Sequence, residues 1–294
     1  MTGPLSSLDR LRAVLERIDE DKLLRAYHVV ERRYELDFGR FPSERAYLDT
    51  QRVIDKRTGR LISGYAQPDG YRLLTPGIDE RVEQGAPHDL IVLNLVIHER
   101  VHKIAKTRTF EPRTTRVHGI EVKFTMEICG FYKYIGMDFP KWFQPEEPWI
   151  AGSNFFLSEG FTECFAREVM REYLNFDPTF ADPDLIAEYF KQIEADAEWA
   201  LYRKAVWLAR ALVKRLGDIE DDHAQVWKDL YGAYFDATDI LMERTWVERF
   251  RAAKIESIMQ SIGAAGRDEL SMLAAALLTC DIEAEVAAAI EAVA

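Results

Sequence analysis

The sequence predicts a mostly helical α+β protein with a small β meander ahead of its most apolar helix. Residues 46–76 carry short β-prone runs separated by turn signals. Residues 88–106 predict a helix, which Asp89 can cap and whose first half is apolar on nearly every side, as in a buried helix. Helical spacing then dominates the C-terminal part of the chain, at about 184–216, 219–260 and 267–292.

The other elements are predicted from spacing and turn chemistry. In 46–76, turns at 56–59 and 68–70 favour an antiparallel meander that packs against a helix. Ser6 or Ser7 can cap the first helical stretch, and the acidic run at 19–21 marks a joint in it. Four further segments are assigned: one helix or two at 6–36, a polar loop at 107–117, a mildly helical stretch at 118–136, and a helix at about 155–174.

A Pro- and Trp-rich connector follows residue 136 and is the expected hinge. We therefore predict an N-terminal lobe at 1–140 and a helical C-terminal lobe at 150–294, which together form one catalytic unit. The Ala-rich last helix can pack on the body or on a second subunit, so a homo-oligomer through the C-terminal helices is a possible assembly.

Composition excludes several classes of protein. The 294 residues carry a formal net charge of −12, which makes the chain a poor ligand for nucleic acid. The three scattered cysteines, Cys129, Cys164 and Cys280, form no CxxC pair and suit a reducing cytoplasm. The first twenty residues lack the basic and apolar regions of a signal peptide, and the longest apolar run, at 90–97, is too short to span a bilayer. We expect a cytoplasmic protein without a membrane or nucleic-acid partner.

One motif carries metal chemistry. Residues 98–102 spell HExxH inside the helix predicted at 88–106. His98 and His102 are i,i+4 partners on one helical face, so both imidazoles can point at one ion. Glu99 lies about 100° around the helix, where it can serve as a general base on a metal-bound water. An apolar helix normally excludes such groups, which favours a functional site over a pair of core histidines.

A catalytic zinc site needs three protein ligands and one open position. The helix predicted at 155–174 is the best source of the third ligand, because Glu159 and Glu163 are i,i+4 partners and face the same way. One carboxylate can bind the ion while the other accepts a hydrogen bond from the far nitrogen of a ligating histidine.

HExxH followed downstream by a helix with ExxxE resembles the gluzincin group of zinc metallopeptidases. The string SEGFTECFA at 158–166 is also similar to the NEGFA-type segment of gluzincin aminopeptidases. The resemblance covers only these two helices. It implies a zincin-like fold and one catalytic Zn²⁺ held by His98, His102 and Glu159. It also implies that Glu163 accepts a hydrogen bond from a ligating histidine. It further implies that a peptide or protein substrate is hydrolysed with Glu99 as the general base.

His118 is an alternative third ligand. It is followed by a glycine and by the apolar pattern of Ile120, Val122 and Phe124, which resembles the third-histidine segment of SprT-like proteases. Those proteins act on DNA-bound protein and often carry a zinc ribbon. The acidic charge and the lack of a cysteine quartet in this chain favour Glu159.

The oxyanion formed during hydrolysis needs a donor besides the metal. His223 is a candidate, because thermolysin-type gluzincins use a downstream histidine supported by an acid, and two aspartates precede it. Tyr231 and Tyr234 fit equally well on chemistry, and an exposed histidine at a helix start is the competing interpretation of His223. The edge strand of the 46–76 meander is expected to bind an extended peptide through main-chain hydrogen bonds.

Two other classes of protein fit parts of the sequence. Glu99/His102 and Glu220/His223 are both ExxH pairs, the unit that carboxylate-bridged di-iron oxidases use twice. A catalytically silent protein of the same fold, binding a partner through its C-terminal helices, is the other alternative. The presence of Glu99 argues against it, because a binding module needs no water-activating base.

Overall fold

The computed structural model describes residues 6–39, 41, 45–55, 60–67, 69–117, 120–138, 150–195 and 197–279. These residues form eleven α-helices and seven strands in two sheets, which confirms a mostly helical α+β protein. The chain divides into two compact units, one made of Met1–Ile104 with Thr162–Val206 and the other of Ala105–Phe161 with Trp207–Ala294. The expected hinge falls largely outside the described residues, so the division into lobes at 1–140 and 150–294 stays a prediction.

The first unit combines helices with a three-stranded sheet. Its elements are α1 (Ser7–Arg17), α2 (Glu20–Arg33), β1 (Arg45–Asp49), β2 (Gly64–Gln67), β3 (Gly70–Leu74), α3 (Thr75–Glu83), α4 (His88–Ile104), α6 (Pro183–Glu194) and the larger part of α5 (Phe155–Phe176). The helices predicted at 6–36, 88–106 and 155–174 are confirmed. Ser6 caps α1 and Asp19 caps α2, each side chain accepting a backbone N–H, so the acidic run does mark the joint between two helices.

The first sheet differs from the predicted meander. Its strand order is β1-β3-β2, with β1 parallel to β3 and β2 antiparallel to β3. The expected turn at 68–70 does connect β2 and β3 as a hairpin, because Gln67 pairs with Gly70. Antiparallel pairing across the expected turn at 56–59 is confirmed in part, as one isolated bridge between Ile54 and Leu61. The parallel strand β1 lies before both expected turns and is not part of an antiparallel meander. This order leaves β2 at an edge of the sheet.

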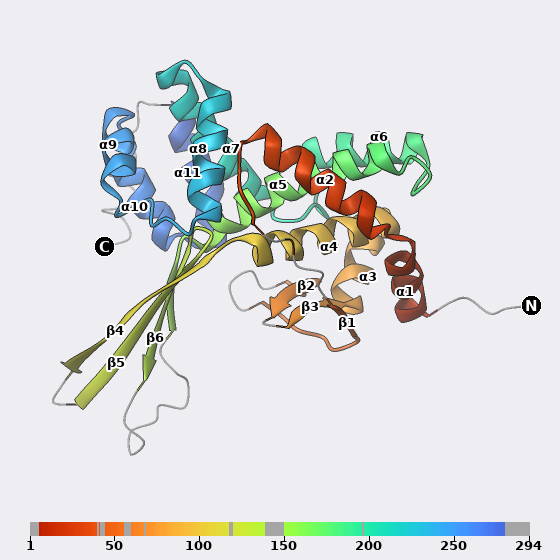
Figure 1. Cartoon of the computed structure of the whole chain (residues 1–294), viewed down its shortest axis with the longest axis horizontal. Helices are drawn as coiled ribbons and strands as arrows, with labels where there is room; N and C mark the ends of the chain where they lie inside the picture. The colour runs from red at the N-terminus through yellow and green to blue at the C-terminus, as the bar shows by residue number, and fades with distance from the viewer. Residues whose placement is uncertain are drawn as a thin grey trace, which may run out of the picture. The chain divides into compact units, whose positions relative to one another are not determined.

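Helix α4 is the centre of the first unit. Every residue from 90 to 101 along it is buried. Figure 1 shows α2 on one side of α4 and the small sheet on the other. The Tyr27 hydroxyl of α2 donates to the Ile97 carbonyl oxygen at 3.1 Å, and the Arg100 guanidinium makes two hydrogen bonds to Glu20 at 2.6 and 2.7 Å. An all-round apolar helix is therefore enclosed by its own unit, as its composition predicts.

Glycine at position 77 lets α3 approach the segment that leads into β2. A Cβ atom added there would clash with the carbonyl oxygen of Ile62 and lie 2.8 Å from the Cα atom of Ser63. The same helix carries Arg81, one turn later, whose Nε donates to the Ser63 hydroxyl at 2.9 Å. The absence of a Cβ atom at Gly77 therefore determines how closely α3 packs against residues 62 and 63, which precede β2.

We expect Gly77→Ala to lower the free energy of unfolding by about 1–3 kcal/mol, because backbone atoms must move to admit the methyl group. Gly232→Ala is the control, since a Cβ there meets nothing within 4 Å and the residue lies inside a helix. That change should stabilise the protein by about 0.5–1 kcal/mol. Urea denaturation of both variants gives the comparison, and equal effects would contradict the close-packing argument.

The second unit contains a four-stranded antiparallel sheet in the order β4-β5-β6-β7. The strands are β4 (Thr107–Val117), β5 (Ile120–Cys129), β6 (Tyr132–Asp138) and β7 (Ile150–Ser153). The loop predicted at 107–117 and the helix predicted at 118–136 are therefore wrong. Strand β4 is mostly exposed, so it lacks the alternation of a half-buried strand. In β5 the apolar side chains do alternate, at Val122, Phe124, Met126 and Ile128.

Helices make up the rest of the second unit. They are most of α7 (Arg203–Glu220), then α8 (His223–Phe235), α9 (Arg244–Ala252), α10 (Glu256–Ala264) and α11 (Leu270–Thr279), with a short 3₁₀ turn at Arg267–Glu269. The predicted helical character beyond residue 183 is confirmed as far as residue 279, although turns divide the long predicted ranges. Residues 280–294, which include Cys280, lie outside the described residues. Across the described part of the chain, no helix is both long and apolar enough to cross a membrane.

Candidate metal centre

Helices α4 and α5 bring together the three side chains that the sequence nominates as metal ligands. One ligand atom each from His98, His102 and Glu159 lies within 4.8 Å of the other two. His98 and Glu159 are buried, with 1% and 6% of their surface exposed, while His102 is partly exposed. Spacing within α4 accounts for the two histidines, since i and i+4 residues share a face.

The donor set fits a single divalent ion. The Nε2 atoms of His98 and His102 are 3.2 Å apart. Two nitrogens that bind one tetrahedral zinc ion at 2.0–2.1 Å lie about 3.3–3.4 Å apart, so the imidazoles already have close to the required separation. Two imidazoles and a carboxylate form a three-ligand set that leaves one coordination position open.

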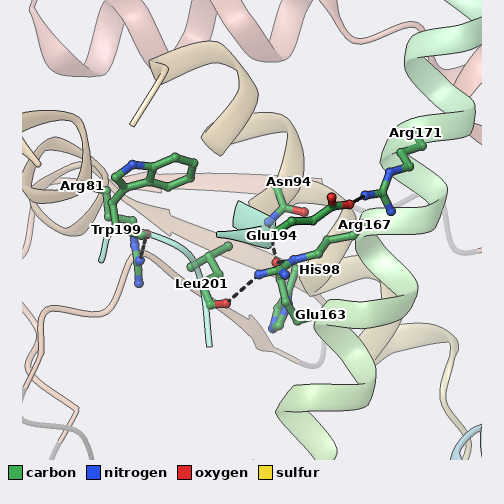
Figure 2. A network of polar contacts seen from close by, with 9 residues as sticks. All are labelled: Arg81, Asn94, His98, Glu163, Arg167, Arg171, Glu194, Trp199 and Leu201. Atoms are coloured by element: carbon green, nitrogen blue, oxygen red, sulfur yellow. Dashed lines mark hydrogen bonds and ion pairs between the residues drawn. The ribbon is translucent and has the colours of Figure 1, made fainter. Parts of the chain in front are cut away.

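Glu163 lies one turn beyond Glu159 on α5 and is fully buried. Its Oε2 atom is 3.0 Å from Nδ1 of His98, and its Oε1 atom accepts hydrogen bonds from Asn94 Nδ2 at 3.0 Å and Arg167 Nε at 2.7 Å (Figure 2). Donation from Nδ1 to the carboxylate leaves the Nε2 lone pair directed at the ion position.

The buried pair of Glu163 and Arg167 keeps this carboxylate ionised. Burial is the largest influence on the pKa of Glu163 and acts to raise it, but Arg167 and then His98 outweigh burial and hold the pKa below its usual range. Burial likewise acts to lower the pKa of Arg167, and the charge of Glu163 raises it overall. The hydrogen bond to His98 is therefore accepted by a charged oxygen.

Sequence reasoning missed two of these partners, Asn94 and Arg167. Asn94 precedes His98 by four residues on α4, and Arg167 follows Glu163 by four residues on α5, so each shares a helical face with a residue of the motif. The i,i+4 rule that nominated the ligands could therefore have found both.

A turn between α6 and α7 also reaches the centre. The Tyr202 ring stacks on the His98 imidazole, with ring centroids 5.1 Å apart and planes 10° apart. Arg167 Nη2 donates to the Leu201 carbonyl oxygen at 3.2 Å, and Arg81 Nη1 donates to that of Trp199 at 2.5 Å (Figure 2). No motif in the sequence indicates this turn, because its contacts are with helices that are distant in the sequence.

Glu99 is also buried, with 4% of its surface exposed. A Cβ atom added at Gly64 would lie 3.1 Å from Glu99 Oε1. The carboxylate therefore lies against the first residue of β2, which is one of the two edge strands in the described sheet. The absence of a side chain at Gly64 makes this approach possible.

The residues predicted to stabilise an oxyanion have other surroundings. His223 begins α8, is about half exposed, and its Nε2 atom lies 3.0 Å from a carboxylate oxygen of Asp218. Tyr231 and Tyr234 are buried among aromatic rings of the second unit that include Phe161 and Phe131. The described contacts assign no catalytic role to any of the three, so these roles stay predictions.

Two alternatives to the triad are His118 as the third ligand and a second metal site at the Glu220/His223 pair. His118 lies outside the described residues, so its exchange with Glu159 stays a prediction. In the second ExxH pair, both carboxylate oxygens of Glu220 accept hydrogen bonds from Arg249, at 2.9 and 2.7 Å. Among the described residues, Glu220 and His223 belong to no group able to hold a metal. The donor set of a second ExxH site is therefore not assembled.

Comparison of the chain with protein-family models, with curated proteins and with solved structures finds no match. The geometry of the three side chains and of their buried partners is therefore the basis for assigning a function to the chain.

Proposed function

We propose that the protein is a zinc-dependent metallopeptidase in which His98, His102 and Glu159 hold one catalytic ion and Glu99 is the general base. The observation that carries the proposal is the convergence of the three ligand atoms within 4.8 Å, backed by the ionised Glu163 on His98. A carboxylate in this position is typical of metal sites in proteins, since a ligating histidine almost always donates its other ring N–H to a carboxylate, a carbonyl or a water.

The chemistry divides between the ion and the chain. A zinc ion in a site of this type lowers the pKa of a coordinated water to about 7 and polarises a carbonyl group. Glu99 takes the proton of the attacking water and passes it to the leaving amine. Its burial against Gly64 fixes the carboxylate in place, and Glu163 fixes the tautomer and orientation of His98.

The edge strand β2 supplies a place for the substrate backbone. Strand β3 pairs with one side of β2, and within the described part of the chain no strand pairs with the other side. An extended peptide can pair with such an edge through main-chain hydrogen bonds. Because Glu99 lies against Gly64 at the start of β2, a peptide bound there would present its backbone beside the general base.

The decisive measurement is the metal content of the purified full-length protein. We expect one zinc per chain, loss of bound zinc in His98→Ala, and loss of peptide-library cleavage with it. His28→Ala on α2 serves as the matched control, because this partly exposed histidine lies outside the ligand group. Two irons per chain would favour the di-iron oxidase instead, and a zinc-loaded protein that cleaves no library peptide would contradict the peptidase.

A further inference from the structure

Two arginines from different helices hydrogen-bond to the turn at 197–202. Arg81 of α3 and Arg167 of α5 each donate to a main-chain carbonyl oxygen of the turn, at Trp199 and Leu201 (Figure 2). Both Trp199 and Leu201 are buried. Since each arginine also bonds elsewhere in the same unit, to Ser63 and to Glu163, the turn is tied to the helices around it at two points.

The next residue, Tyr202, adopts a backbone conformation that tyrosine rarely accepts. Its φ angle is +46°, in the left-handed region where the Cβ atom crowds the backbone. Glycine takes this conformation without strain. Residues other than glycine keep this backbone conformation only where the surrounding structure fixes it, and such residues cluster at functional sites.

The left-handed backbone places the tyrosine ring flat against His98, at 5.1 Å between centroids and 10° between planes. Two of the contacts of His98 restrain its ring: Glu163 accepts from Nδ1 at the edge of the imidazole, and the Tyr202 ring stacks on one face. The hydrogen bond alone would allow the His98 imidazole to rotate about the line from its Nδ1 to Glu163 Oε2. The stacked Tyr202 ring restricts that rotation. Together the two contacts fix the direction of Nε2.

We infer that Tyr202 is a positioning residue of the metal centre, whose ring holds the His98 imidazole in the orientation that binds the ion. The inference rests on the proposed function, because it assigns a metal to the triad. Arg81 and Arg167 act through Tyr202 by holding its turn in place. The phenol ring, not the hydroxyl group, is the part that matters.

Tyr202→Gly tests the inference, because it removes the ring while relieving the left-handed backbone. We expect the affinity for Zn²⁺, measured by chelator competition on the full-length protein, to fall about tenfold, as for the loss of other contacts that orient a ligating histidine. The visible absorption of the Co²⁺-loaded protein should change as well, since it reports ligand geometry. Tyr202→Phe retains the ring and should restore both readouts to their wild-type values.

Glu35→Gly is the matched control, since Glu35 also has a left-handed backbone, with φ +51°, at the end of α2. It should leave Zn²⁺ affinity and the Co²⁺ spectrum unchanged. Wild-type affinity and an unaltered Co²⁺ spectrum in Tyr202→Gly would overturn the inference and leave the proposed function standing. A wild-type protein that binds no metal would overturn both, and a loss of affinity in Tyr202→Phe would show that the hydroxyl group, not the ring, is responsible.

Discussion

Glu99→Gln is expected to reduce peptide hydrolysis by about 10²- to 10⁴-fold, the contribution of a well-placed general base. The amide has the shape of the carboxylate but cannot take the proton from the attacking water. Glu99 is 4% exposed and lies against Gly64, so an isosteric change is the one that preserves the packing there. The measurement is kcat/KM on a peptide identified in the library digest, together with zinc content and thermal stability.

The variant should still bind one zinc, because the three ligands are untouched. Glu80→Gln on α3 is the control for the loss of one negative charge from the same unit, and it should retain wild-type activity. A zinc-loaded Glu99→Gln protein with unchanged activity would show that another group is the base. If cleavage is absent from the wild type as well and every function survives the change, the catalytically silent protein is the better interpretation.

Local patterns predicted the side chains that the structure brings together at the candidate metal centre. The pair His98 and His102 and the pair Glu159 and Glu163 each follow from i,i+4 spacing within one helix, which depends on nothing beyond that helix. The capping of α1 and α2 and the hairpin between β2 and β3 are local as well. Patterns of this kind can be interpreted without knowing which other elements lie nearby.

The parts that sequence reasoning missed depend on distant partners. Nothing in residues 45–49 indicates that β1 pairs with β3 instead of β2, because a parallel pairing is decided by the intervening chain. The exposed strand β4 has no buried face to produce alternation, although the alternating residues of β5 could have identified that strand. Tyr202 stacks on a residue more than one hundred positions earlier in the chain, and no local pattern encodes that contact.

The largest effect on stability is expected from Arg167→Leu. Arg167 is 2% exposed and Glu163 is not exposed at all, with 2.7 Å between Arg167 Nε and Glu163 Oε1. Removing the guanidinium leaves a buried carboxylate without its cation, which costs about 3–5 kcal/mol. Since typical proteins unfold at a free-energy cost of about 5–15 kcal/mol, the variant should lose a large part of its stability. Urea denaturation of metal-free protein measures the loss.

Two companion variants separate charge from packing. Arg171→Leu, one turn further along α5, removes an exposed arginine paired with Glu194 and should change stability by less than about 1 kcal/mol. The double variant Arg167→Leu with Glu163→Gln removes both charges and should recover part of the loss, because no unpaired ion remains. A double variant less stable than Arg167→Leu alone would contradict the ion-pair explanation.

The pH dependence of that loss gives an independent check. In the wild type the pKa of Glu163 is held below its usual range, so the carboxylate contributes stability at neutral pH that is lost as the pH falls through the folded-state pKa. In Arg167→Leu, burial dominates and raises the pKa of Glu163 above its unfolded value, so protonation on acidification relieves the penalty. The stability difference between the two proteins should therefore shrink as the pH is lowered from 7 towards the unfolded pKa of about 4.3. A difference that stays constant over this range would mean that Arg167 stabilises the protein by packing, and that its charge does not keep Glu163 ionised.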